Sequence, residues 1–474
     1  MAKGYSMRVD RLERGCQLGT ESYPKVAAWA ARLGLALASV LFVALIFEYL
    51  VFPRVLPELP LGVQVFLPPE IATLAQSSKA GTVPERYIAL TGDSYAQGLG
   101  DWLHSADPDT NPPYHSAHVL HELSGRDVVT VARGGAGSLT ALVFRPLDYF
   151  RSIRGRSRFP VERPELLIAY YYEGNDLEDT LLELAKLSVE SGQVVVDPGA
   201  AGRPLSREVL RVPLGNPALG SPRSMRAFIE AAHARRSTEK PPGGFFDSLY
   251  FSRFVLALAK GQSERLFPDA ASPGALARWS IPEAGSRVVV GGDLHDLPEA
   301  LQGPALELDE ASTDLALAAY REALGILVSK LEETRLCVVY IPSPLVVYRL
   351  AGEGSKGEGE ASRGPNPPAV QARSRALRDR VGALVRETGT AFVDATPGIQ
   401  RAGKTHFLHG PRDWRHLNQR GYRELAGAVQ ACLGAEGGSP PKKRFGSYSM
   451  ASVARRECLL ALEMKGRALC QKPA

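Results

Sequence analysis

The segment LTGDSYAQGLGDWL, residues Leu90–Leu103, stands where an apolar run ends and a helical pattern begins. The apolar run Tyr87–Leu90 leads into it and predicts a buried strand. Gly-Asp-Ser follows, so Ser94, a small hydroxyl residue, lies where the backbone must turn sharply. Two interpretations of Ser94 are open: it caps a helix, or its hydroxyl is a nucleophile held at the edge of a sheet. The rest of the chain decides between them.

Four further apolar runs predict strands, and helical patterns separate them. They are Val128–Ala132, Leu166–Tyr172, Leu336–Ile341 and Ala391–Asp394. Most of these runs are continuously apolar, which is typical of strands covered on both faces. Apolar residues recur at spacings of three and four from Leu317 to Leu331 and predict one of the intervening helices. This alternation of strand and helix patterns predicts a three-layer α/β domain with a parallel sheet. Ligands of such sheets bind beyond the carboxyl ends of the strands.

The composition is that of an ordinary globular protein. The chain has 474 residues, of which 45% are hydrophobic and 23% charged, and its formal net charge is +5. Residues 434–474 alone carry eight Lys or Arg against three Glu, a net charge equal to that of the whole chain. The rest of the chain is therefore balanced, and we expect no nucleic-acid partner. We expect the basic tail to be solvated, to pack on the domain, to lie at a membrane surface or to bind a partner.

The cysteine pattern gives no sign of a zinc site, because none of the five cysteines forms a CxxC pair. Cys337 lies in an apolar run, and we expect it to be simply buried. Cys432, Cys458 and Cys470 lie late in the chain and could form one disulfide in an oxidising compartment. The sequence does not say which two would pair.

The apolar segment LGLALASVLFVALIFEYLVF, Leu33–Phe52, contains a single charge, Glu48. A helix of this length spans about 30 Å, the thickness of a bilayer core. The alternatives are a cleaved signal peptide, which the length and the lack of a small-x-small site disfavour, or a buried helix. Six Lys or Arg precede the segment, so the positive-inside rule predicts a cytoplasmic N-terminus and an outer domain after Pro53. We predict a single-pass signal anchor.

Five regions follow from these patterns. They are a cytoplasmic segment 1–32, a transmembrane helix 33–52, a Pro-rich spacer 53–82, an outer domain 83–433 and a basic tail 434–474. We expect the spacer to be stiff and to hold the domain away from the membrane. Within the domain, the alternation of strand and helix patterns is interrupted over residues 177–309, which contain Pro- and Gly-rich stretches. We expect them to be an insertion beside the site, with one helix around Phe245–Lys260.

Two residues near the end of the domain could activate Ser94. The stretch GPRDWRHLNQRGY, residues 410–422, places Asp413 and His416 three positions apart. One carboxylate can thus hold the Nδ1–H of the imidazole while Nε2 faces a hydroxyl, which is the arrangement that turns a serine into a nucleophile. Taken alone, a single histidine is more often structural.

Three groups could hold the oxyanion that forms when an ester is attacked. They are the backbone N–H groups of Ser94 and Gly137 and the side-chain amide of Asn175. Gly137 lies in VARGGAGSL and Asn175 in YYYEGNDLED, each just after a predicted strand. Taken alone, Asn175 could simply form an Asx-turn. Because all of these signals fall at strand ends in one chain, together they favour catalysis over separate structural roles.

These stretches resemble the sequence blocks of the SGNH hydrolases, also called the GDSL esterase/lipase superfamily. TGDSYAQG is similar to the first block, with Ser94 as nucleophile, and ARGGAGS to the second, with Gly137 as oxyanion glycine. EGND is similar to the third block, with Asn175 as oxyanion amide. DWRHLNQRGY is similar to the fifth, with Asp413 and His416 completing the triad.

The resemblance covers residues 83–433 and implies a flavodoxin-like α/β fold, no metal or other cofactor, and hydrolysis or transfer of esters. Three positions depart from the family pattern: Tyr95 replaces a leucine, Ala132 an asparagine and Glu173 a glycine. The runs VVYIPSPLVVY and AFVDATP resemble bacterial envelope members. With the anchor, the resemblance implies a serine esterase in the periplasm or outside the cell, and we expect O-acetyl groups of an envelope carbohydrate as substrate. The alternatives are an O-acetyltransferase on a surface polysaccharide, a lipid ester hydrolase, and a catalytically silent envelope assembly module.

Overall fold

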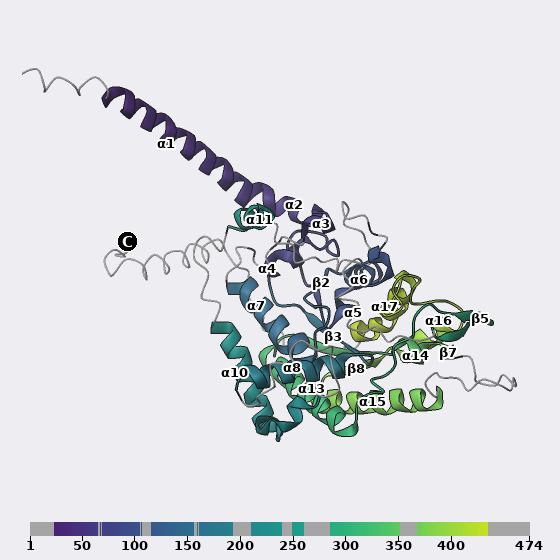
Figure 1. The fold of residues 1–474 in the computed structure, drawn as a ribbon. Coiled ribbons are helices and arrows are strands. Elements are labelled where there is room, and N and C mark those ends of the chain that lie inside the picture. The colour runs from purple at the N-terminus through teal and green to yellow at the C-terminus, as the bar shows by residue number, and fades with distance from the viewer. Residues whose placement is uncertain are drawn as a thin grey trace, which may run out of the picture. The chain divides into compact units, whose positions relative to one another are not determined.

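The computed structural model describes residues 23–64, 67, 69–104, 106, 115–155, 159, 161–192, 210–238, 249–259, 285–350 and 367–434. Its centre is a five-stranded sheet (Figure 1). The strands are β1 (Ile88–Thr91), β2 (Val128–Thr130), β3 (Leu166–Tyr172), β6 (Arg335–Ile341) and β8 (Ala391–Asp394). All neighbours are parallel, in the order β2-β1-β3-β6-β8. This is the flavodoxin-like order of doubly wound sheets, so the predicted α/β fold is confirmed.

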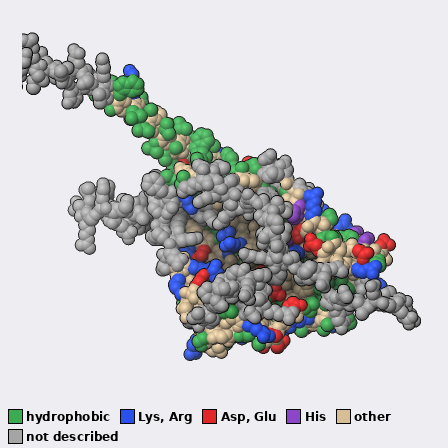
Figure 2. Space-filling view, in the orientation of Figure 1, with side chains coloured by type: hydrophobic (Ala, Val, Ile, Leu, Met, Phe, Trp, Pro, Cys, Tyr) green, Lys and Arg blue, Asp and Glu red, His purple; other side chains and the backbone are tan. Residues whose placement is uncertain are grey.

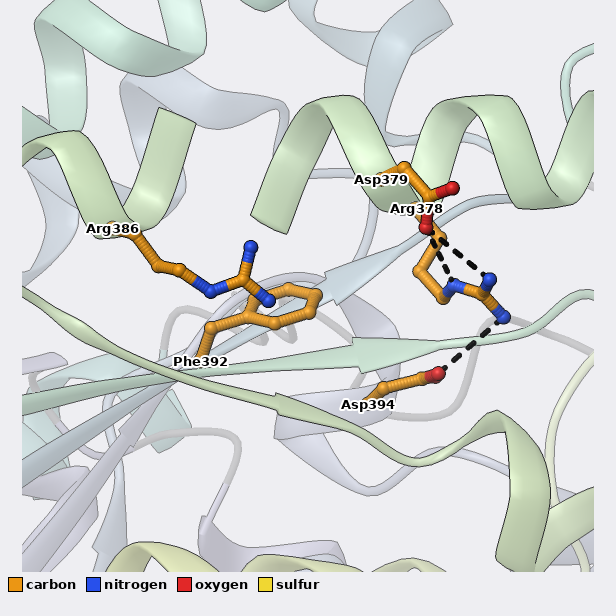
Figure 3. Close-up of a pocket in the computed structure, with 5 residues that line it drawn as sticks. All are labelled: Arg378, Asp379, Arg386, Phe392 and Asp394. Carbon is orange, nitrogen blue, oxygen red and sulfur yellow. Dashed lines mark hydrogen bonds and ion pairs between the residues drawn. The ribbon is translucent and has the colours of Figure 1, made fainter. Parts of the chain in front are cut away.

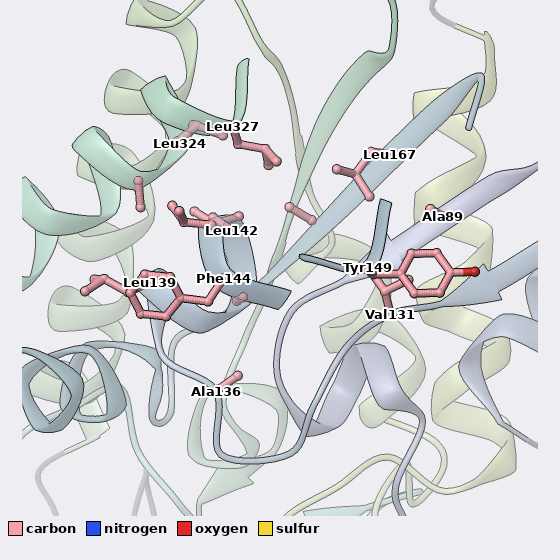
Figure 4. Packing of buried hydrophobic residues seen from close by; sticks show 14 of the residues in the cluster. Ala89, Val131, Ala136, Leu139, Leu142, Phe144, Tyr149, Leu167, Leu324 and Leu327 are labelled. Atoms are coloured by element: carbon pink, nitrogen blue, oxygen red, sulfur yellow. The ribbon is translucent and has the colours of Figure 1, made fainter. Parts of the chain in front are cut away.

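Alternate strand residues face opposite sides of the sheet, and both sides are buried. Ala89 and Leu167 belong to one hydrophobic cluster, and Ile88 and Leu166 to the other. Figure 4 shows the first cluster, in which Leu324 joins the strand residues. Burial on both faces explains why the strands read as continuous apolar runs.

Helices cover both faces of the sheet and complete the three layers. On the side of the first cluster lie α7 (Arg145–Gly155), α8 (Asp176–Glu190), α10 (Pro222–Thr238), α13 (Glu310–Lys330) and α15 (Pro367–Glu387). On the other side lie α6 (Ser116–Ser124), α14 (Pro344–Val347), α16 (Thr396–Gly403) and α17 (Gln419–Gly434). A small antiparallel sheet of β4 (Arg287–Val290), β5 (Asp293–Asp296) and β7 (Arg349–Leu350) adds to the second side.

The predicted insertion 177–309 is only partly separate from the core. Helix α8 supplies Leu181 and Leu184 to the first cluster, and both are 0% exposed. Helix α10 adds Ile229, also 0% exposed. These helices cover the sheet, so the predicted boundary at residue 177 is wrong. The predicted helix around residues 245–260 is confirmed as α11, Tyr250–Ala259.

The N-terminal apolar segment forms α1 (Tyr23–Ile46), continued by a short π-helix (Phe47–Val51) and α2 (Phe52–Val55). Among the described residues, one helical stretch, Ala27–Glu58, is long and apolar enough to cross a membrane by length and composition. Hydrophobic side chains cover the surface of α1 (Figure 2).

The residues after α1 do not form the predicted spacer. Leu56, Ile71 and Leu74 are all 0% exposed and belong to the first hydrophobic cluster. Pro53 and Pro57 lie in the first turns of short helices, where the missing N–H is tolerated. The prolines therefore begin helices instead of an extended rod, and the domain starts at the end of the apolar helix. Of the predicted tail 434–474, all residues except Gly434 lie outside the described residues.

A disulfide joins Cys337 in β6 to Cys432 in α17, 95 positions apart. The expectation that Cys337 is simply a buried thiol is therefore wrong. The bond ties β6, the neighbour of the edge strand β8, to α17, which begins three residues after His416.

Candidate active site

Ser94 lies just after the carboxyl end of β1, in a sharp turn. The two residues before it, Gly92 and Asp93, make this turn possible. Gly92 has φ +143°, and a methyl group there would lie 3.0 Å from the Tyr170 carbonyl oxygen. Asp93 then caps the short helix α5 (Ser94–Gln97) by accepting the Tyr95 N–H at 2.9 Å. The cap is thus Asp93, and the interpretation of Ser94 as a cap is excluded. Ser94 is the first helical residue, and its side chain is left for other contacts.

The structure brings Ser94, Asp413 and His416 together from distant parts of the chain. His416 Nε2 lies 2.9 Å from Ser94 Oγ, and His416 Nδ1 lies 2.7 Å from Asp413 Oδ2. The other carboxylate oxygen of Asp413 accepts the backbone N–H groups of Arg415, at 3.0 Å, and His416, at 3.1 Å. With Nδ1–H donating to Asp413, Nε2 is the atom that accepts the hydroxyl proton of Ser94.

Asp413 remains a carboxylate despite its burial. Burial by itself would raise the pKa of this carboxyl, but the neighbouring His416 charge and the hydrogen bonds from His416 and Arg415 bring the pKa well below its usual range. Asp413 is therefore ionised wherever the protein is folded at ordinary pH. A permanent charge at this place stabilises an imidazolium at His416.

Asn175 is the last of the three residues between β3 and α8, and its side chain does not bond to the backbone. It is the N-cap of α8, but it makes no side-chain cap hydrogen bond. Its Oδ1 is buried without a partner among the described residues. The Asx-turn interpretation is therefore excluded, and the amide of Asn175 stands at the same edge of the sheet as Ser94 because β1 and β3 are parallel neighbours.

The predicted oxyanion glycine is engaged elsewhere. The N–H of Gly137 donates to Glu183 Oε1 at 3.0 Å, and a methyl group at this position would lie 2.5 Å from the backbone of Thr180. Gly137 therefore packs against α8, and the expectation that it offers a free N–H is wrong for this structure. The glycine beside the nucleophile is Gly134, where a methyl group would lie 3.8 Å from Ser94 Cβ. Its N–H donates to Gln97 Oε1 at 2.6 Å, so Gly134 offers no free donor either.

Glu173, which departs from the family pattern, is turned away from the hydroxyl of Ser94. Its carboxylate is 0% exposed and accepts hydrogen bonds from the Tyr340 hydroxyl, from the N–H and hydroxyl of Ser343, both at 2.7 Å, and from the Ser374 hydroxyl at 2.6 Å. These donors come from β6, the turn after it and α15. Glu173 therefore ties the end of β3 to its neighbours.

Three more acids lie around the site, and all are buried: Asp93, Asp176 and Asp179 are 1%, 7% and 8% exposed. Burial raises the pKa of each carboxyl, and repulsion by Asp93 raises the pKa of the other two further. These shifts favour neutral acids and so limit the negative charge beside Ser94. Among the described residues, no group of three or more His, Cys, Asp or Glu side chains is arranged to hold a metal ion.

A surface pocket of about 430 Å³ lies on α15 and β8 (Figure 3). Arg378 in this pocket pairs with Asp379 at 3.2 Å and with Asp394 at 3.4 Å. Arg386 lies over the Phe392 ring at 5.2 Å. None of the residues that line the pocket belongs to the Ser94 site.

The chain matches no family model and no curated protein. Two solved structures are similar to it over 73% of this chain and 98% of theirs, each at 13% identity. One is an extracellular lipase from Streptomyces rimosus, with a TM-score of 0.31, and the other is phospholipase A1 from Streptomyces albidoflavus NA297, with a TM-score of 0.27. Likeness at this level supports no inference about activity.

Proposed function

We propose that this chain is a membrane-anchored serine esterase whose catalytic triad is Ser94, His416 and Asp413. One observation carries the proposal: an unbroken chain of hydrogen bonds runs from the Ser94 hydroxyl through both nitrogens of His416 to Asp413, with lengths of 2.9 and 2.7 Å. A hydroxyl, a base and an oriented acid in this order are what nucleophilic attack on an ester requires.

In the proposed reaction, Ser94 Oγ attacks the ester carbonyl carbon while its proton passes to His416 Nε2. The tetrahedral intermediate then collapses, the bond to the alcohol oxygen breaks, and His416 returns the proton to that oxygen. Water attacks the acyl-serine next, again giving its proton to His416. The acid leaves, and the proton goes back to Ser94. Asp413 holds the imidazole in the tautomer that this sequence needs.

Two donors suit the oxyanion in this proposal. The Ser94 N–H lies in the first turn of α5, where backbone N–H groups have no partner within the helix. The Nδ2–H of Asn175 is the other, because no described contact uses that side chain. Removing one such donor typically costs about 3 kcal/mol of transition-state stabilisation. Gly137 has no part here, since its N–H is bonded to Glu183.

Three features support the proposed location and the proposed acyl group. The apolar helix is preceded by basic residues, which favours an outer domain, and the Cys337–Cys432 disulfide is typical of an oxidising compartment such as the periplasm or cell exterior. Ser94 is only 5% exposed, which suits a small acyl group. We propose O-acetyl groups of an envelope carbohydrate as the substrate, the carbohydrate because the sequence resembles envelope members of the SGNH hydrolases and the domain is proposed to lie outside the cell.

The test is the turnover of p-nitrophenyl acetate by the full chain in detergent, compared between wild type and Ser94→Ala. We expect hydrolysis to fall by at least about a thousandfold in the variant, and a fluorophosphonate probe to label wild type at Ser94 only. Ser124→Ala, a serine at the end of α6, is the control and should keep full activity. Equal rates in wild type and Ser94→Ala would refute the proposal. Release of acetate from an acetylated glycan, with and without an unacetylated acceptor, then separates hydrolysis from transfer.

A further inference from the structure

Glu48, the single charge of the apolar run, is enclosed by a helix from far along the chain. It is 1% exposed, and its carboxylate accepts the N–H groups of Phe251 and Ser252, each at 3.1 Å. These residues lie in the first turn of α11, whose N–H groups have no partner within the helix and favour a negative charge. Helix α11 therefore begins against the apolar helix itself.

Aromatic contacts fix α11 in this place. The Phe251 ring lies 5.5 Å from the rings of both Phe47 and Phe52, and the Phe254 ring lies 5.8 Å from that of Phe52, measured between ring centres. Phe52 and Phe254 are both buried in the first hydrophobic cluster. The end of the apolar helix, α11 and the domain core are thus packed as one unit (Figure 1).

The position of Glu48 sets the depth of α11 relative to a membrane. The apolar run ends at Phe52, four residues after Glu48, which is about 6 Å along a helix. At its other end the run is bounded by Arg32, a charge that is costly inside the hydrocarbon layer. The 20 residues between these ends are about as long as that layer is thick. When this run spans a bilayer, the first turn of α11, which contacts Glu48, therefore lies about 6 Å inside the edge of the hydrocarbon layer.

Two large apolar residues of α11 face outward, beside the exposed Ser252. Val255 is 44% exposed and Leu256 is 53% exposed, whereas Tyr250 and Phe254 on the inner face are buried. Leu50, at the end of the apolar helix, is also 53% exposed. A helix with one apolar face on the protein and apolar residues on the other is suited to the boundary between lipid headgroups and acyl chains.

We propose that α11 is an interfacial helix that seats the domain directly on the lipid bilayer, with Val255 and Leu256 in contact with lipid. The inference rests on the membrane anchoring of the proposed function. Helix α11 contacts the end of the helix that spans the membrane. The membrane that surrounds α1 extends to Glu48, so the outer face of α11 meets the bilayer and not a second protein. Helix α11 also shields the Glu48 carboxylate from lipid. The domain then has one fixed orientation on the membrane.

The test places one fluorophore at a time on the full chain in phosphatidylcholine vesicles. Cys16→Ser, Cys458→Ser and Cys470→Ser remove the cysteines outside the disulfide. An environment-sensitive dye is then attached at Leu256→Cys in α11, Leu41→Cys in α1 or Leu294→Cys in β5. Leu294 is the matched control, because it is 52% exposed against 53% for Leu256. Lipids with a nitroxide near the headgroup, mixed with lipids that carry a nitroxide in the middle of the acyl chain, serve as one quencher, and aqueous iodide serves as the other.

We expect the nitroxide lipid to quench the dye at residues 256 and 41 several-fold more than at residue 294, and iodide to quench residue 294 most. A dye at residue 41 that no lipid quenches would refute the membrane anchoring itself. If residue 41 is quenched by lipid and residue 256 behaves like residue 294, the anchor stands and the interfacial role of α11 is wrong. If neither quencher reaches the dye at residue 256, the interfacial role of α11 is also wrong, and another protein surface covers this face. A circular dichroism spectrum and a thermal midpoint equal to those of wild type confirm that each variant is folded.

Discussion

The hydroxyl group of Tyr95 donates a hydrogen bond to the carbonyl oxygen of Arg415, with 2.5 Å between the two oxygens. Tyr95 follows Ser94 directly and Arg415 precedes His416 directly, so this bond links the neighbours of the proposed nucleophile and base. The Tyr95 ring stacks on Tyr172, with 4.1 Å between ring centres. Burial raises the pKa of Tyr95 well above its usual value, so the hydroxyl stays a donor. A leucine, expected here from the family resemblance, cannot make this bond.

The first prediction concerns Tyr95→Phe, which removes this hydrogen bond and keeps the ring. We expect kcat for p-nitrophenyl acetate to fall about fivefold with little change in KM, since one hydrogen bond is worth about 1 kcal/mol. Tyr422→Phe is the matched control, because the Tyr422 hydroxyl donates to the Leu99 carbonyl between the same two segments but not beside His416. An equal loss of kcat in both variants would mean that Tyr95 only stabilises the fold.

The second prediction concerns Asp413→Asn, which removes the negative charge of this side chain but keeps its hydrogen bonds to the backbone of the turn. The remaining Oδ1 can still accept the N–H groups of Arg415 and His416, but the new amide donates toward His416 Nδ1 and favours the wrong tautomer. We expect kcat to fall on the order of a thousandfold to ten-thousandfold, with little loss of stability. Asp101→Asn is the control, because Asp101 accepts the Arg412 N–H of the same turn at 2.6 Å without touching His416. Nearly full activity of Asp413→Asn would remove Asp413 from the triad.

The third prediction concerns Glu173→Gln, which tests whether this acid acts in structure or in catalysis. Glutamine has an NH2 group where the carboxylate has an oxygen. Each oxygen of Glu173 accepts two hydrogen bonds from buried groups, so two of these donors would meet another donor in the variant. We expect the protein to lose about 1–3 kcal/mol of stability, measured by thermal unfolding in detergent. The kcat per folded molecule should be unchanged, because every described contact of Glu173 is with β6, the turn after it or α15. A fall of a hundredfold in kcat with an intact fold would place Glu173 in the catalytic machinery.

The sheet and the contact between Asp413 and His416 could be predicted from the sequence, because both depend on local patterns. Continuous apolar runs such as Leu166–Tyr172 predict strands buried on both faces, and parallel strands bring the residues after them to one edge. The spacing of Asp413 and His416 likewise predicts their contact, since three positions of one turn separate them. The catalytic roles of these residues stay predictions until activity is measured.

Other features could not be predicted, because they depend on contacts between distant residues. The N–H of Gly137 is bonded to Glu183, 46 positions away, and the sequence around Gly137 gives no sign of it. Cys337 and Cys432 pair across 95 positions. The composition of the Pro-rich segment after Phe52 predicts an extended chain, but its apolar side chains gain more from burial in the core.

The fourth prediction concerns the buried His115, which makes the fold sensitive to acid. His115 is 8% exposed and caps α6 by accepting the His118 N–H through Nδ1 at 3.3 Å. Burial lowers the pKa of His115 to about 3, with a smaller contribution from His118. The unfolded chain, with a histidine pKa of about 6.5, therefore binds more protons between these values. The free energy of unfolding must then fall as the pH drops from about 6.5 toward 3, and His115 contributes about 2 kcal/mol of this fall at pH 5.

His115→Asn keeps a capping acceptor that does not titrate, so its thermal midpoint should fall less than that of wild type between pH 7.5 and pH 5. Equal falls in both proteins would mean that His115 is not held neutral in the folded state.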